Sequence, residues 1–186
     1  FVGGAGVDTI DGNGGNDTIT GAGGADVIDG DTGDDVFRYT ADSDLFTAGN
    51  DLVDNITGGV GTDSIAINNN GGATFTIAAA DDWSARIATT EKIIAVGGTN
   101  QVISITANDN MHAAGITTID LSNDTDSTAT NIINLSGETG ANGFTVMGSS
   151  GIDTITGGTG ADTIDGGTGA IADGLTGGAG LDVFTI

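Results

Sequence analysis

The chain has 186 residues, of which 26 are acidic and 3 are basic, so its formal net charge is −23 at pH 7. This balance argues against nucleic acid or an anionic membrane as a partner and favours a surface that binds cations. The absence of cysteine excludes disulfides and thiol chemistry. No apolar run reaches the roughly 18 residues of a membrane-spanning helix, so no transmembrane segment is expected.

A glycine-rich phrase of nine residues recurs along the chain. Its first four copies follow one another without a break, at 3–11, 12–20, 21–29 and 30–38. Later copies stand at 58–66, 148–156, 157–165, 166–176 (a stretched copy) and 177–185. A short fixed period of this kind predicts a solenoid rather than a single globular core.

Each phrase divides into a turn and a short strand. Glycine accepts positive φ and close backbone approach, so the first half predicts a tight turn whose carbonyl groups converge. The second half predicts a minimal strand with one apolar side chain pointing inward and Thr and Asp neighbours pointing outward. The inward residues are Ile10, Ile19, Ile28, Phe37, Ile155, Ile164, Leu175 and Phe184.

Two phrases would close one flattened coil, which stacks on the next. Asp8 would then lie over Asp26 at about one strand spacing, roughly 4.8 Å, where two carboxylates repel unless a cation lies between them. Calcium fits because it takes about six to eight hard oxygen ligands in flexible geometry. The predicted metal-ligating carboxylates are Asp8, Asp17, Asp26, Asp35, Asp63, Asp153, Asp162 and Asp182. The predicted metal-ligating turn glycines are Gly4, Gly6, Gly15, Gly24, Gly158, Gly160, Gly178 and Gly180.

Some of these aspartates have an alternative role or depart from the repeat pattern. The aspartates could merely solubilise a glycine-rich turn, an alternative that stays open above all for Asp63 in the single copy. Asp173 comes two residues late in the stretched copy and is therefore a doubtful ligand.

The phrases resemble the RTX family, whose repeat is Gly-Gly-x-Gly-x-Asp-x-(large apolar)-x and binds calcium in a β-helix. Asn13, Asp31 and Ser149 depart from the pattern by replacing the second glycine, which a turn tolerates. The resemblance implies an all-β fold, a right-handed parallel β-roll or β-solenoid with calcium-binding turns at both ends. It also implies calcium as the cofactor and type I secretion by a Gram-negative bacterium, with folding outside the cell.

We predict three parts: a first RTX calcium-binding β-roll block at 1–66 with an irregular insertion at 39–57, a strand-rich solenoid-like middle segment at 67–147, and a second block at 148–186. Strands are expected in the middle segment at 73–77, 92–96, 101–105, 116–121, 131–135 and 143–147. The rival layout for the middle segment is a separate antiparallel sandwich. Residues 41–44 read as a loop, and 81–87 as a short helix with Asp82 as N-cap and Trp83 packed over an open edge.

No catalytic constellation is evident, and no enzyme activity is expected. His112 is the only histidine and lies among polar loop residues, where a solvated side chain is the usual outcome. One histidine without cysteine does not build a usual zinc site. Polysaccharide lyases and hydrolases with a β-helix share only the fold class, and the three basic residues here are too few to hold an acidic sugar.

Outward threonines such as Thr9, Thr18, Thr154 and Thr163 raise the alternative of ice binding. Val27 and Val36 interrupt that rank, and the copies are few. Thermal hysteresis would reveal such an activity.

These features predict a structural calcium-binding segment of a secreted bacterial surface protein, such as a surface layer, an extracellular filament or an adhesin. The alternative is an RTX module that serves export and folding of a larger enzyme or toxin. The chain starts at Phe1, directly against the first repeat and without a starting Met, so it is expected to be a fragment or a processed segment.

Repeat units at both ends predict head-to-tail self-association, with Asp8, Asp17 and Asp182 sharing calcium across the junction, or else continuation into further repeats. A cell-surface or polysaccharide partner is compatible with this interpretation. The expected location is extracellular, at the bacterial cell surface.

Overall fold

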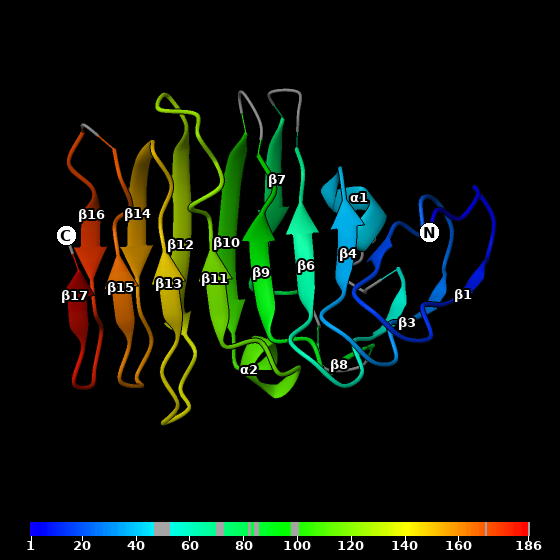
Figure 1. Ribbon diagram of the computed structural model, residues 1–186. Helices are drawn as coiled ribbons and strands as arrows, with labels where there is room; N and C mark the ends of the chain where they lie inside the picture. Colours follow the sequence, from blue (N-terminus) through cyan, green and yellow to red (C-terminus); the bar gives the residue numbers. More distant parts are fainter. Residues whose placement is uncertain are drawn as a thin grey trace.

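The computed structural model describes residues 1–46, 53–69, 73–81, 83, 86–97, 101–169 and 171–185. Within these residues the chain forms a stack of flattened coils whose paired strands run parallel (Figure 1). The predicted parallel β-roll is thereby confirmed.

One face of the stack is a continuous sheet of eight strands. In spatial order these are β2 (Thr18–Ile19), β4 (Val36–Tyr39), β6 (Ser64–Ile67), β9 (Lys92–Ala95), β11 (Thr118–Asp120), β13 (Thr145–Met147), β15 (Thr163–Asp165) and β17 (Val183–Thr185). The sheet runs through both glycine-rich blocks and the segment between them. A separate antiparallel sandwich in the middle is therefore wrong.

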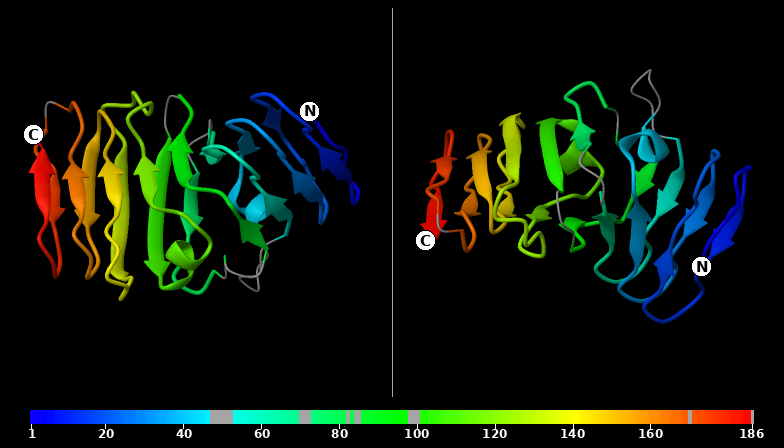
Figure 2. Two further views of the ribbon diagram at one scale, coloured as in Figure 1. Left: turned by 60° about the horizontal axis from the view of Figure 1, so that its bottom comes forward. Right: turned by 90° about the horizontal axis from the view of Figure 1, so that it is seen from above.

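The opposite face consists of two sheets rather than one. The first contains β1 (Thr9–Asp11), β3 (Val27–Asp29), β5 (Asn55–Thr57) and β8 (Ile87–Ala88). The second contains β7 (Thr74–Ile77), β10 (Val102–Asn108), β12 (Thr130–Gly137), β14 (Ile152–Thr156) and β16 (Gly174–Thr176). The chain between β6 and β9 supplies one strand to each sheet, and the first coils are inclined to the later ones (Figure 2).

The core is a ladder of apolar side chains between the two faces. On the continuous sheet, register pairs Phe37 with Ile65 and Ile65 with Ile93, and all three side chains are buried. On the opposite face Ile105 pairs with Ile133 and Ile133 with Ile155. Burying one such side chain stabilises the fold by about 1.5–3 kcal/mol.

Strands of the middle segment bury more apolar area than the strands of the glycine phrases. On the opposite face, a short repeat strand such as β3 contributes one inward residue, Ile28. By contrast β10 alternates over seven residues and buries Ile103, Ile105 and Ala107, and β12 buries Ile133 and Leu135. The middle of the roll therefore has a wider hydrophobic core than its ends. All six strands predicted there are present.

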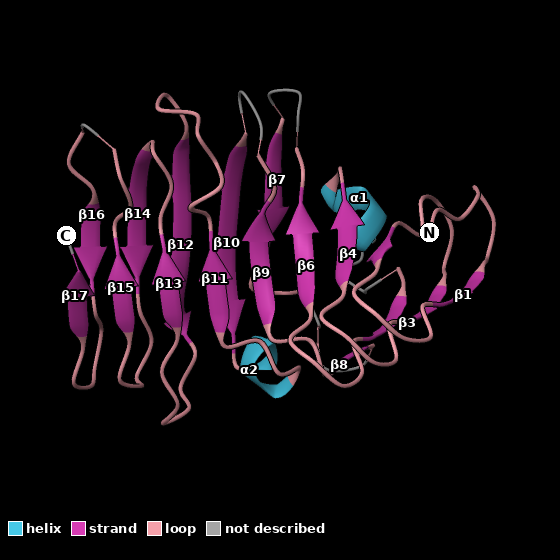
Figure 3. Ribbon diagram, in the orientation of Figure 1, coloured by secondary structure: helices cyan, strands magenta, loops and turns pink. Residues whose placement is uncertain are grey.

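Two short helices lie outside the sheets, α1 (Asp42–Leu45) and α2 (Asn110–Ala113) (Figure 3). The expected loop at 41–44 is wrong because Leu45 is fully buried and draws this turn against the core. No described helix is long and apolar enough to cross a membrane.

The helix expected at 81–87 is wrong in its described part, since Ile87 begins β8, whereas Asp82, Ser84 and Ala85 lie outside the described residues. Trp83 is 1% exposed and meets Phe46 edge to face, with the ring centroids 5.2 Å apart. It fills the interior rather than covering an open edge.

Candidate metal centre

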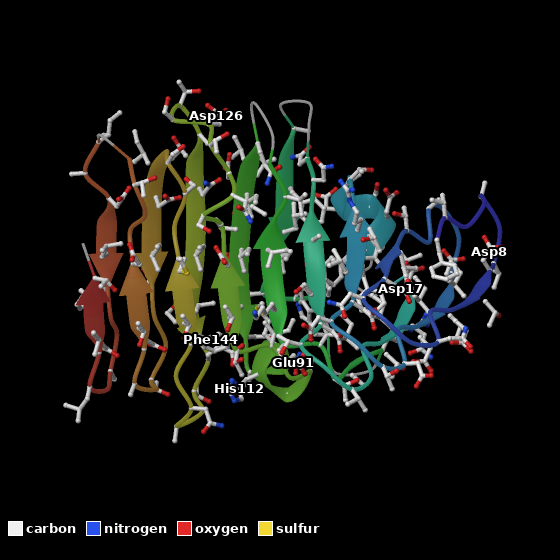
Figure 4. All side chains as sticks on the ribbon, viewed as in Figure 1. Asp8, Asp17, Glu91, His112, Asp126 and Phe144 are labelled. Atoms are coloured by element: carbon white, nitrogen blue, oxygen red, sulfur yellow. The ribbon has the colours of Figure 1, made fainter. Side chains whose placement is uncertain are left out.

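Most of the predicted aspartates occupy one structural position, the entrance to a strand where the turn meets the sheet, whereas Asp153 is the second residue of β14 (Ile152–Thr156). On the continuous sheet, Asp17, Asp35 and Asp63 directly precede β2, β4 and β6. On the opposite face, Asp8 and Asp26 directly precede β1 and β3. Figure 4 labels Asp8 and Asp17 near the N-terminal end of the roll. Parallel pairing places equivalent residues of successive coils over one another, so the aspartates form stacks.

Hydrogen bonds connect each stack from coil to coil. The backbone N–H of one aspartate donates to Oδ1 of the aspartate one coil later. This contact joins Asp8 to Asp26 (2.8 Å), Asp17 to Asp35 (2.8 Å), Asp26 to Asp54 (2.9 Å), Asp35 to Asp63 (2.8 Å), Asp153 to Asp173 (2.9 Å) and Asp162 to Asp182 (3.0 Å). The N-terminal and C-terminal aspartates thus form separate stacks at the two ends of the roll.

The second carboxylate oxygen has a different environment from one aspartate to the next. Turn amides donate to Oδ2 in some copies, from Gly4 to Asp8 at 2.6 Å and from Gly158 to Asp162 at 2.9 Å. In four others, Oδ2 is buried without a hydrogen-bond partner among the described residues: Asp17, Asp26, Asp35 and Asp63. A buried carboxylate oxygen without a partner is costly unless a cation or a donor compensates it. These residues therefore fit a bound cation.

The turn glycines place backbone carbonyl groups between the coils. A Cβ added to Gly24 would lie 2.3 Å from the Gly6 carbonyl oxygen, and one added to Gly180 would lie 2.0 Å from that of Gly160. Equivalent close approaches join Gly33 to Gly15 and Gly178 to Gly158. Several of the predicted glycine carbonyls therefore face the neighbouring coil, where a ligand between coils would meet them.

Two of the predicted glycines have carbonyls that already accept a hydrogen bond. Gly4 accepts from Gly23 at 3.2 Å, and Gly158 accepts from Ala179 at 3.0 Å. To bind a cation, each of these carbonyl oxygens would have to use its second lone pair. The backbone N–H groups of both glycines also donate to the aspartate of their own repeat.

No group of three or more His, Asp or Glu side chains capable of holding a metal gathers among the described residues. The stacks explain this, because each turn contributes one carboxylate and successive turns are a strand spacing apart. A cation here would take most of its oxygens from the backbone, as the flexible coordination of calcium allows.

Three acidic residues join the stacks although they were not assigned as ligands. Asp54 continues the stack of Asp8 and Asp26. Asp173 follows Asp153 in its stack, although it comes two residues late in its phrase. Glu91 accepts a hydrogen bond at Oε2 from the backbone N–H of Asp63 at 2.8 Å. One sequence signal would have found them: every stacked acid lies two residues before an inward apolar residue, as Asp173 does before Leu175.

The stack of Asp8, Asp26 and Asp54 ends on a tyrosine. The Tyr39 hydroxyl donates to Oδ2 of Asp54 at 2.7 Å, and both residues are buried. Burial raises the pKa of Asp54 above its ordinary value and raises that of Tyr39 well above its own. Tyr39 therefore supplies to Asp54 the partner that Asp26 lacks.

Asn131 stands in a stack position on the opposite face. It is fully buried and in register with Asp153, and its Oδ1 accepts from the backbone N–H of Ile103 at 2.9 Å, as the stacked carboxylates do. Its Nδ2 donates to Oδ2 of Asp124 at 3.3 Å and to Oγ of Ser149 at 3.1 Å. The Asn131 side-chain amide thus makes hydrogen bonds at a position of the stack where a third carboxylate would need a cation.

Asn131→Asp is therefore expected to make this level depend on calcium. The substitution removes both Nδ2 hydrogen bonds and buries another charge beside Asp124 and Asp153, so the free energy of unfolding in chelator should fall by about 2–4 kcal/mol. Calcium should recover most of the loss, which urea unfolding with and without calcium would measure. Asn134→Asp is the control, because Asn134 lies on the same strand, is half-buried and accepts only a local hydrogen bond at Oδ1 from the Ser136 N–H. Equal losses in both media would contradict the interpretation.

Glu138 is a buried carboxylate outside the stacks. It is 4% exposed and accepts hydrogen bonds from the backbone N–H groups of Met111 and His112. Its Oε1 has no partner within the described ranges. Burial raises its pKa from an ordinary 4.5 to about 7, and the charge of Asp109 adds to the effect. His112 is half-buried against Phe144, with ring centroids 5.4 Å apart, so the expected solvated side chain is wrong (Figure 4).

The raised pKa of Glu138 gives a pH-dependent stability. Between pH 4.5 and about 7 the folded chain binds this proton and the unfolded chain releases it, so folding stability should fall as pH rises through that window. Glu138→Gln keeps an acceptor oxygen and should flatten the dependence. Urea unfolding at pH 5 and pH 8 in saturating calcium measures it, with Asp120→Asn as a control for lost charge. An unchanged pH dependence in Glu138→Gln would contradict the assignment.

Parallel coils with stacked carboxylates and inter-coil carbonyls define the class: a β-roll with cation-binding turns. The family model for the RTX calcium-binding nonapeptide repeat, in four copies, matches residues 2–37 and 139–170. The chain therefore carries RTX repeats, and RTX nonapeptide repeats bind calcium. Comparisons with curated proteins and with solved structures found no match.

The second matched segment starts before the second block predicted at 148–186. Residues 139–147 end in β13, and Phe144 takes the stack position there, donating its backbone N–H to Oδ1 of Asp162 at 2.7 Å. The single copy at 58–66 lies outside both matched segments. RTX repeat proteins are typically secreted by bacteria, which suggests an extracellular location.

Proposed function

We propose that this chain is a structural, non-catalytic calcium-binding segment of a secreted bacterial surface protein, such as a surface layer, a filament or an adhesin. It folds outside the cell when calcium occupies the turns and then presents a stiff roll. The predicted aspartates and glycines are the proposed ligands, in the stacks and inter-coil positions described above.

The buried, unpartnered Oδ2 atoms of Asp17, Asp26, Asp35 and Asp63 support this proposal most strongly. With a net charge of −23 and 3 basic residues in the chain, side-chain cations are too few to compensate them. A cation that binds only the folded form adds about 2.7 kcal/mol per site at one hundred times its dissociation constant. The free energy of calcium binding is therefore large enough to control folding.

Self-association is part of the proposal. The first and last coils expose apolar side chains, with Phe1 56%, Val2 79%, Leu181 88% and Phe184 45% exposed. A second copy docking head to tail would cover these side chains and pair the open strand edges, with Asp8, Asp17 and Asp182 near the junction. Further repeats of the same precursor would cover them equally well.

A calcium titration from chelator, followed by circular dichroism and light scattering, tests the proposal. A cooperative gain of β signal with growth in particle mass is the expected result. Folding without an increase in particle mass would contradict self-association. It would favour the alternative, an export and folding module of a larger secreted enzyme or toxin. A spectrum indifferent to calcium would overturn the structural role of calcium.

A further inference from the structure

The stack on the continuous sheet extends beyond the glycine phrases. Asp17, Asp35 and Asp63 belong to phrases, but the next level is Glu91, which directly precedes β9 (Figure 4). Pairing of Ser64 with Lys92 puts Glu91 one coil after Asp63. The 2.8 Å contact from the Asp63 amide to Glu91 Oε2 equals the contact from Asp35 to Asp63. Glu91 is therefore a structural equivalent of the repeat aspartates.

Two oxygen atoms converge at this level. A Cβ added to Gly58 would lie 1.9 Å from the Thr89 carbonyl oxygen and 2.5 Å from Oδ2 of Asp63. One coil earlier, a Cβ added to Gly30 would lie 2.5 Å from the Gly58 carbonyl oxygen and 2.3 Å from Oδ2 of Asp35. The Thr89 carbonyl thus takes the place of a repeat glycine carbonyl.

Thr89 adopts a backbone conformation that normally belongs to glycine. Its φ is +49°, in the left-handed region, which is unusual for a β-branched residue. Its Oγ accepts the backbone N–H of Gly59 at 2.8 Å and donates to the Ala88 carbonyl at 2.8 Å. These contacts hold a glycine-like turn in a segment without the glycine phrase.

The level also carries an unmet charge. Asp63 is fully buried, and its Oδ2 has no hydrogen-bond partner in the part of the chain that the structure describes. The negative charges of Asp35, Glu91 and Asp34 act on this carboxylate. A carboxylate buried among like charges needs a cation or a proton.

We propose that Asp63, Glu91 and the Thr89 carbonyl form a calcium site between the 58–66 phrase and the middle segment. Two carboxylates and a carbonyl are the hard oxygen ligands that calcium prefers. This site lies outside both segments that match the RTX repeat, and two of its three groups come from a turn without glycine. It fastens β6 to β9 and so joins the first block to the middle segment.

Glu91→Gln in the full chain tests the site, because glutamine keeps an acceptor for the Asp63 amide and loses only the charge. Isothermal titration with calcium is expected to show one fewer bound ion per chain than the unchanged protein. Hydrogen exchange in saturating calcium should show faster exchange in β6 and β9 and unchanged exchange in β15. Asp120→Asn, whose side chain holds only the local Ser122 turn, should bind the full number of ions.

Asp63→Asn repeats the test from the other side of the site and should also lose at least one ion. The inference rests on the proposed calcium-dependent function, but the two can fail separately. If Asp35→Asn loses an ion and Glu91→Gln does not, the site at Glu91 is overturned while the proposed function stands. If neither variant changes the count, both are overturned.

Discussion

On removal of calcium, the amides of β2, β4, β15 and β17 are expected to lose about a hundredfold of their protection against hydrogen exchange, whereas those of β10 and β12 keep most of theirs. The reason is the distribution of charge along the roll. Both ends stack carboxylates, and four of those at the N-terminal end have a buried oxygen without a partner among the described residues, whereas Phe144 and Ile103 take stack positions in the middle. A hundredfold change corresponds to about 2.7 kcal/mol, the contribution of one well-occupied site.

Hydrogen exchange with mass spectrometry, in calcium and in chelator, measures this difference. Magnesium in place of calcium is the control and should restore little protection, because magnesium demands a tighter octahedron and keeps its waters. Uniform loss of protection along the chain would show that the wide core around Ile105 and Ile133 does not keep the middle segment folded without calcium. Unchanged protection at both ends would mean that calcium has no structural role.

Gly24→Ala is expected to destabilise the first block by about 2–4 kcal/mol, whereas Gly23→Ala should cost less than about 0.5 kcal/mol. Gly24 has φ of +136°, and an added Cβ would lie 2.3 Å from the Gly6 carbonyl oxygen. The adjacent Gly23 has ordinary φ, and an added Cβ would meet nothing within 4 Å. The clash at Gly24 is with backbone, which cannot move without opening the coil.

Urea unfolding in saturating calcium gives the two free energies, and calcium titration shows whether Gly24→Ala also weakens binding. The two variants add the same methyl group to neighbouring positions of one turn, so composition cannot explain a difference between them. Equal effects would contradict the close stacking of turns between the first two coils.

The repeat itself contains most of what can be predicted about this fold. A period of nine with one inward apolar residue predicts stacked parallel strands, because only that arrangement buries every such side chain on one line. Asp8 and Asp26 lie over one another as expected, since their separation of 18 residues is one coil of the tandem block. The strand residues of the middle segment were also predictable, because alternation of apolar and polar residues reports burial locally.

Other features depend on which coils become neighbours. In the stretched copy Asp173 does not stand at the aspartate position of the nine-residue motif, so the motif alone does not identify it. Pairing of Leu175 with Ile155 nevertheless places Asp173 in the stack with Asp153. Asn131 gives no sign in its sequence that it replaces a carboxylate, because its partners Asp124 and Ser149 come from other turns.

A parallel roll with acidic turns follows from the amino-acid sequence, because the nine-residue period, the turn glycines and the inward apolar residues act within a single repeat. The residues at which the carboxylate stacks change or stop depend instead on contacts between coils: Tyr39 with Asp54, Asn131 beside Asp153, and Glu91 beyond Asp63. Tertiary structure also divided the opposite face into two sheets between β7 and β8. These outcomes depend on the register between coils, which brings Asp63 to Glu91 28 residues later and is set by packing of the whole stack rather than by any single phrase.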